Sequence, residues 1–151
     1  MTERQTDRQH GLKRDRQAQR GRTQRTPGQR LGLRGETAAA SFLERRGLRI
    51  LARNYRWREG EIDIIAAEDP FRVCEAADTI RFIEVKTRSS ERYGTPGASV
   101  TFGKQAKIRR TALKWLQEQE HPVFGNLCFD VIEVCVLDGR ARLRWLKDCF
   151  F

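Results

Sequence analysis

Two short segments place charged side chains where the surrounding sequence is typical of buried β-strands. Asp63 lies among isoleucine and alanine residues in 61–67, and Glu84 and Lys86 lie in the apolar segment 79–87. Unpaired charge is costly to bury, so these residue types need partners there. Two carboxylates can hold a divalent ion, and a lysine beside them supplies positive charge next to a phosphate. The pattern therefore predicts a metal-dependent phosphodiesterase site.

Strand geometry predicts that these side chains meet. Side chains alternate across a strand, so Glu84 and Lys86 share one face, about 7 Å apart along it. If the two strands are antiparallel neighbours folded about the middle of 68–78, Asp63 falls roughly opposite Glu84, at about 5 Å. Carboxylates that close repel unless a cation lies between them or one takes a proton. We expect the cation to be Mg²⁺, with Mn²⁺ as a substitute.

Two interpretations of the lysine remain open on this basis. Lys86 can stabilise charge on the transition state, or it can position and deprotonate the attacking water. The alternative for all three residues is an ion-pair cluster on a solvated sheet, which is a common arrangement of Glu and Lys.

Hydrophobic periodicity and turn residues predict the elements that would position these side chains. Apolar residues recur at helical spacing in two segments, and the remaining apolar segments are short and bounded by turn residues. The predicted fold is a mixed α/β fold with the order α-β-β-β-α-β-β, a mixed sheet flanked by helices. The expected elements are a helix over 30–46, strands over 48–57, 61–67 and 79–87, a helix over 103–120, and strands over 127–137 and 141–147.

The positive charge of the chain is concentrated at its N-terminus. The 151 residues carry a formal charge of +10, and residues 1–34 hold ten Lys or Arg against three acidic residues. This segment has few large apolar residues, so it cannot offset its ordering entropy by burial. We therefore expect a disordered basic arm over 1–29 and one domain over 30–151. The arm either attaches the protein to nucleic acid through phosphates or is a solvated extension.

Composition also excludes several classes of protein. No apolar run of about 18 residues exists, the N-terminus lacks an apolar signal core, and the arm has no serine, unlike a transit peptide. The four cysteines show no C-x-x-C spacing and mostly sit among apolar neighbours. They are typical of reduced, mostly buried cysteines. We therefore expect a cytoplasmic protein without a zinc site.

The segments 60–63 (GEID) and 82–88 (FIEVKTR) resemble the YraN-like family of small bacterial proteins. That family is related to archaeal Holliday-junction resolvases and to the PD-(D/E)xK restriction-endonuclease-like superfamily. The resemblance extends over most of 31–151 and includes the segments 92–96 and 129–132. It implies a restriction-endonuclease-like core and a nuclease active on DNA, in particular branched or otherwise structured DNA.

The resemblance also implies a role for each site residue. Asp63 and Glu84 would bind the metal, Lys86 would complete the Glu-x-Lys pair, and Glu36 would be the acid of the first helix. Glu36 would approach the metal directly or through water, or hold the lysine; otherwise it is an ordinary glutamate near a helix start. Resolvase relatives act as dimers, which implies a homodimer, with the terminal 150–151 pair as a candidate interface.

Basic residues follow the Glu-x-Lys strand and predict a nucleic-acid interface. Arg88 and Arg92 lie in the expected loop, and Lys104 and Lys107 share one face of the second helix. Contacts with phosphates would place the DNA backbone over the metal site. The alternative is a solvated helix face. Asp130, in an apolar strand, is expected to bond to the first helix or to Lys104.

Some positions depart from the family pattern. Acidic residues usual after 94–96 are absent from 97–100, Cys128 replaces a usual arginine, and the 68–78 connection is long. These departures leave a second interpretation of the chain, a non-catalytic module of nuclease-like fold that binds nucleic acid or a protein partner.

Overall fold

The computed structural model describes residues 25–68, 79–89, 100–120 and 125–150. The chain divides into two units, residues 1–30 and 31–151, and the second carries the sheet. The predicted arm over 1–29 lies almost wholly outside the described residues and stays a prediction. The same holds for the 69–78 connection and for the 90–99 loop with Arg92.

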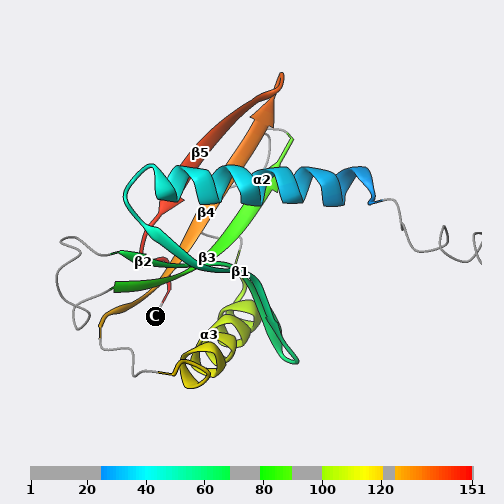
Figure 1. Cartoon of the computed structure of the whole chain (residues 1–151). Helices are drawn as coiled ribbons and strands as arrows, with labels where there is room; N and C mark the ends of the chain where they lie inside the picture. The colour runs from blue at the N-terminus through cyan, green and yellow to red at the C-terminus, as the bar shows by residue number, and fades with distance from the viewer. Residues whose placement is uncertain (1–24, 69–78, 90–99, 121–124, 151) are drawn as a thin grey trace, which may run out of the picture. The chain divides into compact units, whose positions relative to one another are not determined.

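In the part of the chain that the structure describes, seven elements follow the predicted order α-β-β-β-α-β-β (Figure 1). Five described strands form one mixed sheet in the order β1-β2-β3-β4-β5, and among them only β3 and β4 pair in parallel. The parallel pair follows from the connection through α3, because parallel neighbours need a crossover. The elements are α2 (Pro27–Glu44), β1 (Arg49–Trp57), β2 (Gly60–Glu68), β3 (Thr79–Arg88), α3 (Phe102–Gln117), β4 (Leu127–Leu137) and β5 (Arg140–Leu146).

The first helix begins three residues before the predicted start. Thr26 and Gln29 form a reciprocal capping box, in which Gln29 N donates to Thr26 Oγ1 at 3.2 Å and Thr26 N to Gln29 Oε1 at 2.9 Å. Pro27 occupies the first helical position, where its missing N–H costs nothing. The TPGQ sequence of residues 26–29 thus starts a helix inside the segment predicted as arm.

Each face of the sheet packs against one helix. Ala39 and Leu43 of α2 share one buried apolar cluster with Ile83 of β3, and Ile108 of α3 shares the other with Phe82. The alternation along β3 therefore separates the two cores, as strand geometry requires. Strict alternation fails in β2, because Ile62 and Ile65 belong to the same cluster although they are three residues apart.

A close contact between α2 and β3 sets the depth at which the helix packs. A Cβ built on Gly35 would lie 1.8 Å from Thr87 Oγ1, so only glycine fits at this point. The helix backbone therefore lies directly against the end of β3, one residue beyond Lys86. Glu36 follows Gly35 in sequence and is carried to the same region of the sheet.

We predict that Gly35→Ala and Gly32→Ala have opposite effects on stability. The first introduces the clash with Thr87 and should cost about 1–3 kcal/mol. The second meets no atom within 4 Å and should stabilise the helix by about 0.5–1 kcal/mol. Urea unfolding of both variants checks the prediction. Adding Thr87→Ala to Gly35→Ala should recover part of the loss, and equal effects of the two alanines would contradict the close contact.

Asp130 forms a buried network that differs from the expected contacts. Its carboxylate is fully buried and accepts from Arg81 Nη1 (3.0 and 3.2 Å), Trp145 Nε1 (2.9 Å) and Asp148 N (2.8 Å). The expectation of a bond to the first helix or to Lys104 was therefore wrong. Asp130 joins β3, β4 and the end of β5, so its role is to hold the sheet.

The exposure of the cysteines and of Phe150 differs from what the sequence predicts. Cys128, Cys135 and Cys149 are free thiols, but they are partly exposed rather than buried, and Cys74 lies outside the described residues. Phe150 is buried in the cluster on the α3 side, so it is not an exposed dimer contact. No helix among the described residues is long and apolar enough to cross a membrane.

Candidate functional site

Asp63 lies where the pairing of β2 with β3 ends. The last ladder pair is Ile64 with Ile83, and one further step places Asp63 across from Glu84. The backbone bond that would follow is replaced by a side-chain bond, because Val85 N donates to Asp63 Oδ2 at 2.7 Å. Asp63 and Glu84 therefore lie opposite each other, as strand geometry predicted.

Glu84 is the most buried carboxylate of this site. It is 5% exposed, and its Oε1 accepts from Lys86 Nζ at 2.8 Å and from Lys104 Nζ. Its other oxygen, Oε2, is buried and finds no hydrogen-bond partner among the residues that the structure describes. A buried charged oxygen without a partner is costly, so this position favours a cation or a donor supplied from outside the chain.

The surroundings of Asp63 favour its protonated form. Burial is the largest cause, and the charge of Glu84 adds to it, so that the pKa of Asp63 is raised to about 7. The bond from Val85 N and the charge of Lys104 act in the opposite direction. A divalent ion would relieve the repulsion that raises this pKa.

The two lysines at this site come from different elements. Lys86 lies two residues after Glu84 on β3, whereas Lys104 comes from the first turn of α3. Burial acts to lower the pKa of Lys104, but its bond to Glu84 and the Glu84 charge outweigh burial and raise it. Lys104 is therefore an ammonium group held on the same oxygen as Lys86.

Glu36 lies within electrostatic reach of the two opposed carboxylates. It is half-buried on α2, and its negative charge contributes to the raised pKa of Asp63. The four residues predicted to be catalytic are thus drawn toward one end of the β2–β3 pair. Glu36 is placed there by the close contact of Gly35 with β3.

The donor set suits a metal that needs few protein ligands. Within the described ranges, no three His, Cys, Asp or Glu side chains converge in a geometry for a metal ion. Mg²⁺ is usually held by one or two carboxylates and keeps its other positions for water and phosphate oxygens. Asp63 and Glu84, with the unpaired Oε2 of Glu84, fit that requirement, whereas a zinc site of four protein ligands does not.

The predicted nucleic-acid contacts do not all lie in one place. Lys107 is exposed on α3, and Arg88 ends β3 beside Cys135 of β4. Lys104 is turned toward Glu84 and is part of the carboxylate site rather than of a solvated helix face. Arg92 lies outside the described residues.

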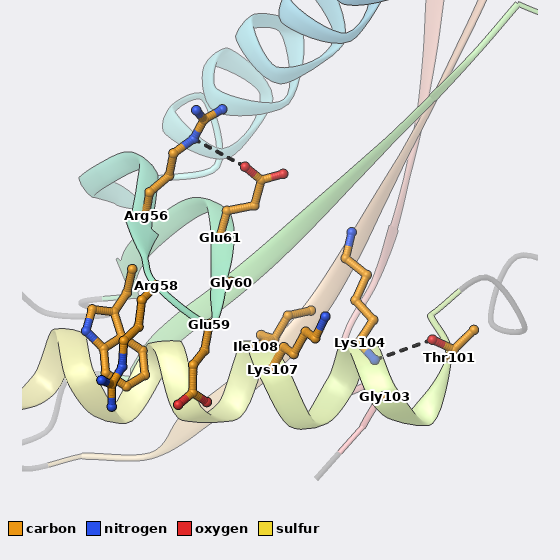
Figure 2. A pocket seen from close by; sticks show the side chains of 11 residues that line it. Arg56, Arg58, Glu59, Gly60, Glu61, Thr101, Gly103, Lys104, Lys107 and Ile108 are labelled. Atoms are coloured by element: carbon orange, nitrogen blue, oxygen red, sulfur yellow. Dashed lines mark hydrogen bonds and ion pairs between the residues drawn. The ribbon is translucent and has the colours of Figure 1, made fainter.

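A cleft of about 730 Å³ opens between the β1–β2 hairpin and the start of α3. Figure 2 shows hairpin side chains, including Arg58 and Glu59, on one side and Lys104 and Lys107 on the other. Lys104 lines the cleft and also bonds to Glu84, so the cleft adjoins the carboxylate site. The full lining is Arg56, Trp57, Arg58, Glu59, Gly60, Glu61, Thr101, Gly103, Lys104, Lys107 and Ile108.

Sequence reasoning missed the hairpin wall of this cleft and the bond from Lys104 to Glu84. The signal for the hairpin was present in residues 56–58, where two arginines flank a tryptophan beside a turn. No comparable signal marked Lys104, because its contact depends on how α3 is rotated on the sheet.

The residues of this site fall within a recognised protein family. A family model described as "Uncharacterised protein family UPF0102" matches residues 35–134, which include Glu36, Asp63, Glu84, Lys86 and Lys104. The chain belongs to family UPF0102. The resemblance to YraN-like proteins is thereby confirmed.

Full-length relatives show the same similarity. A UPF0102 protein of Nocardia farcinica is 46% identical over 123 residues, which cover 81% of this chain and 90% of the relative. UPF0102 proteins of Syntrophus aciditrophicus and Alkaliphilus oremlandii are 42% and 41% identical. These alignments cover 80% of this chain and 88% and 97% of the respective relatives. The similarity therefore spans most of each protein.

Proposed function

We propose that this UPF0102 protein is a cytoplasmic, Mg²⁺-dependent endonuclease that hydrolyses phosphodiesters in branched or otherwise structured DNA. The observation that carries the proposal is Glu84, a buried carboxylate that faces Asp63, bonds to Lys86 and has one oxygen without a partner among the described residues. Mn²⁺ is expected to substitute for Mg²⁺, since both prefer oxygen ligands.

Each residue of the site has a distinct part in this proposal. Asp63 and Glu84 would hold the metal, which when bound polarises the phosphate and lowers the pKa of water. Lys86 Nζ, fixed by Glu84, directs positive charge to where negative charge develops on the phosphate. Glu36 adds negative charge beside Asp63 and so favours a cation at the pair. Lys107 would contact the DNA backbone beside the site, and a homodimer would present two such sites to a junction.

The proposal is tested by cleavage of linear, nicked and four-way-junction DNA in Mg²⁺ and in Mn²⁺. Glu84→Gln and Lys86→Ala are expected to lower the cleavage rate at least about 100-fold, because each removes a charge that acts on the transition state. Glu44→Gln is the control, since Glu44 is an exposed carboxylate at the end of α2 and is not among the residues that line the cleft. Its cleavage rate should stay within about twofold of the unmodified protein.

A non-catalytic nucleic-acid-binding module is the second candidate, and one contact favours it. Lys104 donates to the same Glu84 oxygen as Lys86, and two ammonium groups there compete with a metal ion. This candidate predicts DNA binding without cleavage on all three substrates in both metals, and no change of Mg²⁺ binding heat in Glu84→Gln. That combined result would overturn the endonuclease proposal.

A further inference from the structure

Trp57 differs from the other two tryptophans of the chain. Trp115 is buried in one apolar cluster and Trp145 packs against the other, whereas Trp57 belongs to neither. Trp57 instead lines the cleft from the hairpin side, and the Arg58 guanidinium lies 5.0 Å from its ring centroid. A large aromatic ring that the core does not use is available to a ligand.

A second exposed aromatic residue lies at the start of α3, between two residues that line the cleft. Phe102, the first residue of α3, is 89% exposed, and its neighbours Thr101 and Gly103 both line the cleft. A phenylalanine side chain that is almost fully exposed does not contribute to the packing of α3. Trp57 therefore lines the cleft, and Phe102 is an exposed aromatic residue at its edge, outside the lining itself.

The cations of the cleft are incompletely neutralised. Lining residues include four Lys or Arg and two glutamates, so the cleft carries excess positive charge. Within the part of the chain that the structure describes, Lys107 and Arg58 have no carboxylate partner. Lys104 lines the cleft and also bonds to Glu84, so the positively charged cleft adjoins the Asp63–Glu84 pair.

The two walls of the cleft are fixed to each other. A Cβ at Gly60 would lie 3.0 Å from Thr111 Oγ1, so the hairpin turn lies tightly against α3. An ion pair between Glu59 and Arg110 ties the same turn to the helix. The two elements that carry the aromatic and basic groups are therefore held in place before a ligand binds, which lowers the entropy cost of binding.

We propose that this cleft binds an unpaired segment of a nucleic-acid strand and leads it to the Asp63–Glu84 pair. Bases would stack on Trp57 and Phe102, and phosphates would contact Arg58 and Lys107. Aromatic side chains bind unstacked bases, whose ring faces a duplex covers, and basic groups beside them follow the backbone. That the strand is led toward the Asp63–Glu84 pair rests on the proposed nuclease function. The cleft narrows the proposed substrate to DNA with a single-stranded portion.

The test compares single-stranded and duplex binding in EDTA, where cleavage does not interfere. A fluorescein-labelled oligothymidylate of about 12 nucleotides and a blunt duplex of equal length serve as probes. Trp57→Leu and Phe102→Ala are each expected to weaken single-strand binding about tenfold, since a stacked base contributes about 1–3 kcal/mol. Duplex affinity should change less than about twofold. Strand binding should also quench tryptophan fluorescence, and Trp57→Leu should abolish that quenching.

Two matched controls separate stacking and charge from general effects. Leu113 is an apolar residue of the same helix and is 56% exposed, so Leu113→Ala should leave single-strand binding unchanged. Lys107→Gln should reduce the salt dependence of single-strand binding by about 0.7 in log–log slope, as loss of one phosphate contact requires. Arg140→Gln, at the start of β5, should not change that slope.

The outcomes distinguish this inference from the nuclease proposal. Single-strand affinity that Trp57→Leu and Phe102→Ala both leave unchanged, or an equal loss for duplex and single strand, would overturn the inference. Strand binding that depends on both aromatics without any cleavage in Mg²⁺ would support the cleft and overturn the endonuclease. DNA cleavage, together with single-strand binding that neither Trp57→Leu nor Phe102→Ala changes, would support the endonuclease and overturn the strand-binding cleft. Phe102→Ala keeps the test valid if Trp57→Leu misfolds, because an exposed side chain contributes little to stability.

Discussion

Replacing Asp130 with alanine is expected to lower the free energy of unfolding by about 3–5 kcal/mol. The carboxylate is fully buried and holds Arg81, whose side chain is 8% exposed, together with the Trp145 indole. Its removal leaves a buried guanidinium with Glu68 as the remaining partner at hydrogen-bond distance, at 2.7 Å from Arg81 Nε. Breaking one side of a buried ion pair is costly because the other charge stays desolvated.

Urea unfolding of graded variants measures this effect. Asp130→Asn keeps one acceptor oxygen, for either Trp145 Nε1 or Asp148 N, and loses the charge that faces Arg81, so it should cost less than alanine. Glu120→Ala, an exposed carboxylate after α3, is the control and should change stability by less than about 0.5 kcal/mol. A double variant, Arg81→Met with Asp130→Leu, should recover much of the loss. Equal costs for Glu120→Ala and Asp130→Ala would contradict the buried network.

The second large effect is a gain in stability on replacing Asp63 with asparagine in metal-free protein. The pKa of Asp63 is raised from 3.8 to about 7 in the folded state, chiefly by burial and then by Glu84. The folded protein therefore binds a proton that the unfolded chain releases, so stability falls as pH rises through this interval. Asparagine avoids this loss and can still accept from Val85 N. The expected gain is about 4 kcal/mol above pH 7, since the folded and unfolded pKa values differ by about 3 and one pKa unit is worth about 1.4 kcal/mol.

The pH dependence gives this prediction its sharpest form. The stability difference between Asp63→Asn and the unmodified protein should be small near pH 4 and grow to its full value by about pH 7.5. Urea unfolding in EDTA across this range measures it. Glu61→Gln, the exposed control on the same strand, should show a flat difference. A gain that does not increase with pH would contradict the burial of an ionised Asp63.

Adding Mg²⁺ connects this prediction with the proposed function. A ligand that binds only the folded state stabilises it in proportion to the logarithm of its concentration above the dissociation constant. Mg²⁺ should therefore stabilise the unmodified protein and not Asp63→Asn. The ionised carboxylate of Asp63 then lowers the stability of the metal-free protein but is required for metal binding. Such a conflict between stability and function is typical of functional sites.

Sequence alone determined the elements and the central pair of strands. Periodicity and turn residues predicted all seven elements in order, because local patterns of apolar residues report which side chains face a core. The 127–137 strand matches β4, and the Asp138–Gly139 turn adopts positive φ at both residues, which a type I′ hairpin turn requires. Strand alternation also placed Glu84 and Lys86 on one face and Asp63 opposite, since period-two geometry and antiparallel register are properties of short segments.

Only the tertiary structure decided which distant groups complete the site. The bond from Lys104 to Glu84 depends on how α3 is rotated on the sheet, and the proximity of Glu36 depends on how closely Gly35 approaches Thr87. Arg81 rather than a helix residue holds Asp130, and the cleft beside Trp57 exists because the hairpin turn packs on α3. These features arise from packing between elements far apart in the chain, and packing depends on shape and volume that a local pattern does not encode. Sequence thus determined a carboxylate pair with its lysine, and the tertiary structure supplied the second lysine, the third acid and the adjoining cleft.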